Sequence, residues 1–218
     1  MKKKILIVAG LLLTVYSLSM CKNIFSAFSE PVDEADFQRI TLPKTGQTTC
    51  YEPFCSSGTC PTVSCAGTGE DGEYQMGVSW PNPRFKDNGD GTVIDRLTGL
   101  MWIKAPDAAQ RNWHDALNYV RTLTTGGYSD WRPPNNNELK SLTHYGQASP
   151  AAWLNTQGFT NIQTVSAFYW SATTHVSSPA QVYYLDFIGN TLFIALKTDT
   201  NYVLAVRFSG GGAVTIPR

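Results

Sequence analysis

The sequence Asp130-Trp131-Arg132-Pro133-Pro134-Asn135-Asn136-Asn137-Glu138-Leu139 is the stretch around which the rest of this chain is organised. Each proline disfavours the helical conformation in the residue before it, so the segment is expected to stay extended up to the second proline. Asn135 can then cap a helix, and Glu138, three residues later, can return the hydrogen bond as in a capping box. The pattern predicts a helix that starts here, buries its leucines and stops at Gly146. It fits equally a plain strand-to-helix turn that carries no chemistry.

The first 21 residues are predicted to be an export signal and not part of the fold. Lys2-Lys3-Lys4 precedes an apolar run over residues 5–20, which is shorter than the roughly 20 residues of a bilayer-spanning helix and typical of a signal peptide. The run ends in Leu18-Ser19-Met20-Cys21, which resembles a bacterial lipobox with Cys21 as the lipidated residue. Met20 departs from the usual small residue, so ordinary cleavage or an uncleaved anchor is the alternative. The expected location is the cell envelope, as an outer-membrane lipoprotein held by its N-terminal lipid, or else periplasmic or secreted.

The charge balance argues against a nucleic-acid partner. The chain holds 17 basic and 17 acidic residues, and three of the lysines fall in the leader. The remainder is slightly acidic and its basic residues are scattered, whereas polyanion-binding proteins usually gather them in a patch. We therefore expect no nucleic acid among the partners.

Four cysteines, Cys50, Cys55, Cys60 and Cys65, recur at every fifth position, and none follows Cys65. The cysteines of an exported chain tend to pair, and four of them allow three connectivities. A four-thiolate zinc site is the alternative, but its ligands usually come as close pairs separated by a longer span. The spacing therefore predicts two disulfides that staple a small segment, with no metal.

The composition divides the rest of the chain into a tether over residues 22–44, the cysteine-stapled segment over 45–77 and a globular domain over 78–218. This domain opens with a predicted hairpin at residues 84–95, whose Asn-Gly and Asp-Gly pairs are strong turn signals. The hairpin also contains three aspartates. Their spacing does not match that of an EF-hand loop, so no calcium site is predicted.

A helix, a long loop and four strands complete the predicted elements. Apolar side chains at i, i+3, i+4 and i+7 from Trp113 predict an amphipathic helix over residues 112–123, capped by Asn112 and ended by Gly126-Gly127. A long irregular loop is expected over residues 147–165. The predicted strands of an antiparallel meander are 168–173, 181–187, 191–196 and 201–208. In the last strand, alternation places every second residue from Tyr202 on one face.

Several short motifs in the domain follow one another in the order found in a known family. They are Asn88-Gly89-Asp90-Gly91-Thr92-Val93, Thr98-Gly99-Leu100-Met101-Trp102, the helix with Trp113 and Ala116-Leu117, the stretch 130–139, Tyr169-Trp170-Ser171-Ala172-Thr173 and Val206-Arg207. Together they resemble the Lcl C-terminal domain family of bacterial surface proteins, over about residues 45–208. Pro133 stands where a leucine is usual, which is a small local departure.

This resemblance implies both fold and function. Members resemble the formylglycine-generating and C-type lectin-like folds, so an α+β domain is expected, with two helices packed on curled antiparallel sheets and a long loop region. A founding member is an adhesin that binds glycosaminoglycans. The formylglycine-generating relatives bind copper through a cysteine pair, which this domain lacks. His114, His144 and His175 are dispersed, so no catalytic residue, enzyme activity or cofactor is expected.

The expected function is therefore a non-catalytic, adhesin-like binding module of the cell envelope that recognises a glycan or a surface protein. Aromatic side chains offer flat apolar area to sugar rings, and amides and carboxylates can bond sugar hydroxyls. The candidate ligand-binding residues are Trp153, Asn155, Tyr169, Tyr183, Tyr184, Asp186, Asn201 and Tyr202. The same aromatics can equally serve as packing residues. The alternatives are a structural envelope lipoprotein without a small ligand and an enzyme of the formylglycine-generating superfamily.

Overall fold

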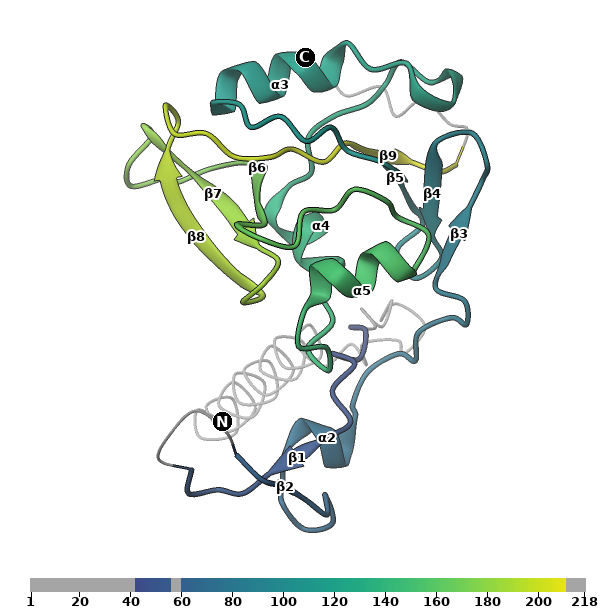
Figure 1. Ribbon diagram of the computed structural model, residues 1–218, viewed down its shortest axis with the longest axis vertical. Coiled ribbons are helices and arrows are strands. Elements are labelled where there is room, and N and C mark those ends of the chain that lie inside the picture. The colour runs from purple at the N-terminus through teal and green to yellow at the C-terminus, as the bar shows by residue number, and fades with distance from the viewer. Residues whose placement is uncertain (1–41, 56–59, 211–218) are drawn as a thin grey trace, which may run out of the picture. The chain divides into compact units, whose positions relative to one another are not determined.

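A computed structural model describes residues 42–55 and 60–210 of the chain (Figure 1). The predicted signal peptide, Cys21 and the predicted tether up to residue 41 lie outside these residues. Within the described ranges, no helix is both long and apolar enough to cross a membrane. The same ranges contain four α-helices and three antiparallel sheets. This confirms the α+β class, while the C-type lectin-like fold stays a prediction.

The first large sheet begins with the predicted hairpin. Strands β3 (Phe85–Asp87) and β4 (Thr92–Asp95) pair antiparallel, and their turn holds Gly91 at φ 88°, a region that glycine enters without strain. β5 (Leu100–Ile103) and β9 (Val206–Phe208) extend the sheet in the order β3-β4-β5-β9. The hairpin prediction is confirmed.

The second large sheet is a meander of β6 (Phe168–Thr174), β7 (Gln181–Asp186) and β8 (Thr191–Leu196). Its strands pair antiparallel in the order β6-β7-β8, which confirms the prediction for these three. The register between β6 and β7 shifts between Trp170 and Thr174, where the ladder is irregular. Among the described strands β8 pairs only with β7, so it is an edge of this sheet.

The C-terminal run does not form the single strand predicted for residues 201–208. Only Val206–Phe208 is a strand, and it pairs with β5 in the first sheet instead of closing the meander. Residues 203–207 are all buried, so the predicted alternation was wrong for a segment that is enclosed on both sides. Single β-bridges at Asn201 and Tyr202 hold the first part of the run.

Helix α3 (Trp113–Arg121) confirms the first predicted helix. The side chain of Asn112 accepts a backbone N–H of the first turn at 3.0 Å, as an N-cap does. Ala116 and Val120, on the predicted apolar face, are fully buried. The helix ends several residues before the predicted glycine stop, which instead lies in a short 3₁₀ helix, η1 (Thr125–Gly127).

Helix α4 (Asn136–Ser141) carries the predicted capping box. The side chain of Asn135 accepts the backbone N–H of Glu138 at 2.9 Å, and the carboxylate of Glu138 accepts that of Asn135 at 2.8 Å. The helix stops well before Gly146. Hydroxyl groups at its end, including that of Thr143, donate to the carbonyls that a further turn would need.

The region predicted as an irregular loop, residues 147–165, contains a helix that was not predicted, α5 (Pro150–Thr156). The hydroxyl of Ser149 caps it, and a proline occupies its first position, where a backbone N–H is not needed. The expectation of two helices was therefore wrong. In Figure 1, α3 and α5 lie on opposite sides of the fold, with β5, β9 and α4 between them.

The cysteine-stapled segment contains β1 (Cys50–Tyr51), β2 (Thr62–Val63) and the short helix α2 (Asp71–Tyr74). Its two disulfides are nested, Cys55–Cys60 inside Cys50–Cys65. This confirms the predicted pairing of the four thiols and selects one of the three connectivities. Gly72 packs so closely on the outer disulfide that a Cβ there would lie 2.7 Å from the Sγ of Cys50.

A buried ion pair joins the first sheet to the end of α4. Arg84 and Asp95, which are 3% and 0% exposed, pair through Nε–Oδ1 at 3.0 Å and Nη2–Oδ2 at 2.7 Å. Nη2 of Arg84 also donates to the carbonyl of Ser141 at 2.5 Å. The carboxylate accepts two further bonds, from the amide of Leu97 and the hydroxyl of Thr98. The carboxylate is therefore fully satisfied without water.

Removing the carboxylate should be costly because it leaves a buried guanidinium without a counter-charge. We expect Asp95→Ala to lower the free energy of unfolding by about 3–5 kcal/mol. Urea denaturation followed by tryptophan fluorescence measures this change. Asp87→Ala is the matched control, since Asp87 pairs with Lys104 at the surface, and it should unfold close to the wild-type midpoint. Equal midpoints for the two variants would contradict the role of the buried pair.

Candidate functional site

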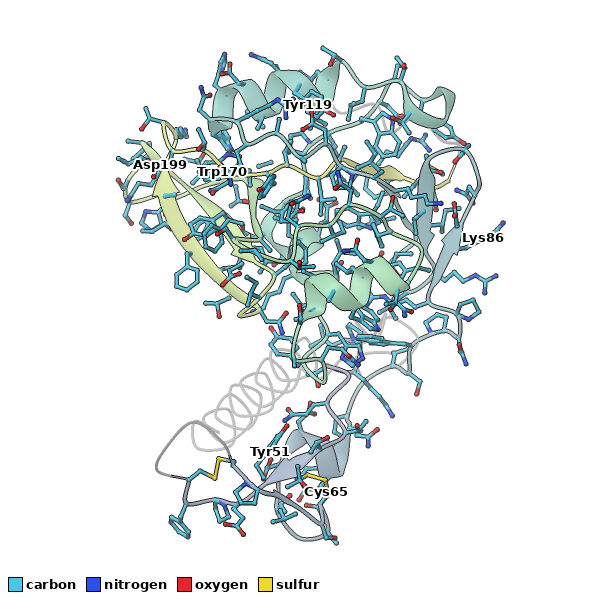
Figure 2. All side chains as sticks on the ribbon, in the orientation of Figure 1. Tyr51, Cys65, Lys86, Tyr119, Trp170 and Asp199 are labelled. Atoms are coloured by element: carbon cyan, nitrogen blue, oxygen red, sulfur yellow. A yellow bond between two sulfur atoms is a disulfide. The ribbon has the colours of Figure 1, made fainter. Side chains whose placement is uncertain are left out.

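One face of the β6-β7-β8 sheet carries neighbouring aromatic rings. The register pairs Trp170 with Tyr184 and Tyr184 with Phe193, and paired residues lie on the same face of a sheet. Their ring centroids are 6.1 and 5.8 Å apart, and Phe168 lies 5.4 Å from Tyr184. Trp170 is buried and anchors the row, because its indole N–H donates to the carbonyl of Arg111 at 2.8 Å (Figure 2). We call Phe168, Tyr184 and Phe193 the aromatic platform.

The aromatic platform is accessible and lies next to a carboxylate. Phe193 is 47% exposed, and its two platform neighbours are half-buried. Asp186 pairs with Phe168 and so shares this face; its Oδ1 accepts a backbone N–H at 2.8 Å. Burial, followed by the negative charges of Asp186 and Asp199, raises the pKa of Tyr184. The tyrosine hydroxyl therefore stays protonated and can act as a donor.

Two of the eight candidate residues, Tyr184 and Asp186, lie at this surface. Tyr183 lies on the opposite face, because successive residues of a strand alternate. Phe168 and Phe193 were not among the candidates, although both belong to the platform. The short connection between β7 and β8 is a signal that could have placed Phe193 opposite Tyr184, since turn length sets the register of a hairpin.

Four other candidates hold the fold together. The amide of Asn155 closes the chain after α5, donating to the carbonyl of Ile162 at 2.8 Å and accepting its N–H at 2.9 Å. Tyr169 is fully buried, its hydroxyl accepts a backbone N–H at 2.9 Å, and burial raises its pKa. Tyr202 packs on Tyr169 with centroids 5.5 Å apart, and Asn201 is buried. Tyr169 and Asn201 thus lie in the interior, Asn155 and Tyr202 are half-buried, and all four serve the packing of the fold.

The remaining candidate, Trp153, belongs to a separate aromatic cluster. Its ring centroid lies 4.7 Å from that of His144 and 5.7 Å from that of Trp80, and those two rings are 4.7 Å apart. The cluster packs α5 against the loop after α4 and the segment before β3. Desolvation, and then the positive charge of Arg84, lowers the pKa of His144. Trp153 therefore has a packing role in this cluster.

The three aspartates of the β3–β4 region have partners within the protein. Lys104 donates a hydrogen bond to Asp87, Thr92 donates one to Asp90, and Arg84 donates to Asp95. In the part of the chain that the structure describes, no group of three or more His, Cys, Asp or Glu side chains is placed to hold a metal ion. His114 is exposed on α3, whereas His175 packs on Tyr183 at 5.5 Å.

The family model described as the Lcl C-terminal domain matches residues 91–207. The match begins in the turn of the β3–β4 hairpin and ends in β9, so it contains the whole aromatic platform. The cysteine-stapled segment and Arg84 precede it. No curated protein matches the chain.

The lowered pKa of His144 makes stability depend on pH. Because the folded pKa lies below the ordinary value, the unfolded chain binds the proton more readily. The stability contributed by neutral His144 is complete above about pH 6.5 and is lost as the pH falls from there. We expect the free energy of unfolding to drop between about pH 7.5 and about pH 5.5 by less in His144→Gln than in the wild type. Urea titrations at both pH values test this, and an identical drop in the two proteins would contradict it.

Proposed function

Because the family model covers more than half of its 218 residues, this chain belongs to the Lcl C-terminal domain family, and we propose that it is a non-catalytic cell-surface module that binds a carbohydrate through the aromatic platform. Membership indicates a surface-associated domain. The two disulfides support an exported location, since such bonds persist in oxidising compartments. The lipid at Cys21 is part of the same proposal and supplies the link to the membrane.

The observation that carries the proposal is the half-exposed platform beside Asp186. Pyranose rings present flat patches of C–H groups, which pack on aromatic faces, while their hydroxyls donate to carboxylates. Phe193 supplies open aromatic area, Tyr184 supplies a ring with a donor hydroxyl, and Asp186 supplies an acceptor on the same face. A sugar ring matches this combination better than a purely apolar ligand does.

The rigidity of the aromatic platform also favours it as a binding surface. Tyr184 lies on the central strand of the meander, and the buried ring of Trp170 packs against it. A surface that is ordered before the ligand arrives loses little conformational entropy on binding. The platform can therefore hold a weakly interacting ligand without first ordering a loop.

The competing function is a structural envelope component that pairs with another protein. Its supporting observation is the edge strand β8, where Ile194 and Leu196 are 42% and 49% exposed on the face opposite the platform. An open strand edge with apolar side chains can add a strand from a partner. Ile194 and Leu196 point away from the aromatic platform, so substitutions at these two residues separate the two functions.

The experiment is a glycan array with the purified full-length protein, followed by calorimetry with the best-bound oligosaccharide. Phe193→Ala should weaken binding by about tenfold because it removes most of the open aromatic area. Tyr184→Phe keeps the ring and loses only the hydroxyl, so its effect should be smaller. Phe54→Ala is the matched control, since Phe54 is 95% exposed outside the platform and its loss should leave affinity unchanged.

Three results would contradict the proposal. One is the lack of any saturable glycan on the array. Another is an affinity that is the same in Phe193→Ala and the wild type. The third is release of a smaller sugar product, which would make the protein an enzyme. Melting temperatures recorded for each variant ensure that lost binding is not lost folding.

A further inference from the structure

A pocket of about 120 Å³ lies between the segment before β3 and the end of α4 with the residues that follow it. Two hydrogen bonds fix its walls. The amide of Tyr145 donates to the carbonyl of Thr45 at 3.0 Å, and the indole N–H of Trp80 donates to the carbonyl of Lys44 at 2.8 Å. Because both walls are bonded across long sequence separations, the pocket is a built feature of the fold. It lies outside the aromatic platform and shares no residue with it.

Three of the residues that line the pocket are cationic and none is acidic. The cations are Lys44, Arg84 and Lys140. Asp95 neutralises Arg84, so the uncompensated charge belongs to the two lysines. Neither lysine forms an ion pair with any residue in the described part of the chain. A cavity of this charge disfavours metal cations and attracts anions.

Arg84 is the buried cation among the residues that line the pocket. Its side chain is almost fully buried, and Nε and Nη2 are used by Asp95 and Ser141. Nη1 is buried and has no hydrogen-bond partner among the described residues. A buried guanidinium N–H without an acceptor is costly. Nη1 is also closed to solvent, so an anion in the pocket does not reach it, and the charge of the lysines carries the attraction.

The rest of the lining selects the kind of anion. Pro43, Leu97 and the ring of Trp80 contribute apolar surface to the same pocket. A volume of about 120 Å³ holds a group of a few heavy atoms and excludes a nucleotide or an oligosaccharide. A site with cations at one part and hydrocarbon at another matches a short-chain carboxylate better than a fully hydrated inorganic oxyanion.

We propose that this pocket binds a small organic carboxylate. The carboxylate group lies between Lys44 and Lys140 with Arg84 behind it, and the short apolar tail packs on Leu97 and Trp80. This site is independent of the carbohydrate surface. Ligand binding here ties the segment before β3 more firmly to the end of α4, because Lys44 and Lys140 come from those two segments.

The test is isothermal calorimetry of the full-length protein with sodium propionate as the probe, at an ionic strength held constant with sodium chloride. We expect saturable binding in the millimolar range. Lys140→Ala should weaken it by about tenfold through the loss of one charge-assisted contact. Lys140 is exposed, so the variant keeps the fold. Lys86→Ala, which removes an exposed lysine on β3 outside the pocket (Figure 2), is the control and should bind like the wild type.

Titrations with other ligands test whether the pocket selects a carboxylate. Propionamide has nearly the same shape without the charge and should not bind. Sodium sulfate should compete much less well than propionate, and competition of equal strength would overturn the carboxylate assignment. An affinity for propionate that is unchanged in Lys140→Ala, or no saturable binding up to about 50 mM, would overturn the site. Phe193→Ala should bind propionate normally, so this result is separable from that of the glycan experiment.

Discussion

A guanidinium and a carboxylate held away from water, those of Arg84 and Asp95, are the constraint on which the rest of this structure depends. Desolvating two charges is expensive, and the cost is offset only when the geometry is good and the remaining bonds are made. Asp95 meets that condition with bonds from Arg84 and from the backbone and hydroxyl that follow β4. Arg84 then reaches the carbonyl of Ser141, which sets the end of α4 against the first sheet.

The Arg84–Asp95 pair also positions the aromatic side chains that surround it. The guanidinium stacks 4.5 Å from the ring of Trp80, and Trp80 in turn contacts His144 and Trp153. The segment upstream of the matched family region is thereby packed on α5 and on the loop after α4. The pocket forms along this junction, while the aromatic platform stands on a separate sheet. One chain therefore presents two surfaces of different chemistry, a cationic pocket and an aromatic face beside a carboxylate.

Sequence reasoning succeeded where the signal is local. The capping box of α4 needs only Asn135 and Glu138, three residues apart, and the β3–β4 hairpin needs only its glycine-containing turn. It failed where distant contacts decide the structure. Residues 201–205 have strand-like composition, yet they are enclosed between elements and do not extend a ladder. α5 was missed because its cap, Ser149-Pro150, opens a helix of only seven residues. The pocket could not be predicted, because Lys44 and Lys140 are far apart in sequence.

The most direct test of the central claim is hydrogen exchange in the native chain and in an Asp95→Asn variant, which keeps the shape of the side chain and removes its charge. Three protons decide the matter: the indole N–H of Trp80, the amide of Tyr145 and the amide of Leu185 in the meander. If the buried pair holds the upstream segment against α4, exchange of the first two should accelerate in the variant by at least about tenfold more than exchange of Leu185, which reports the general loss of stability. Unchanged exchange at Trp80 and Tyr145, or an equal acceleration of all three, would contradict it.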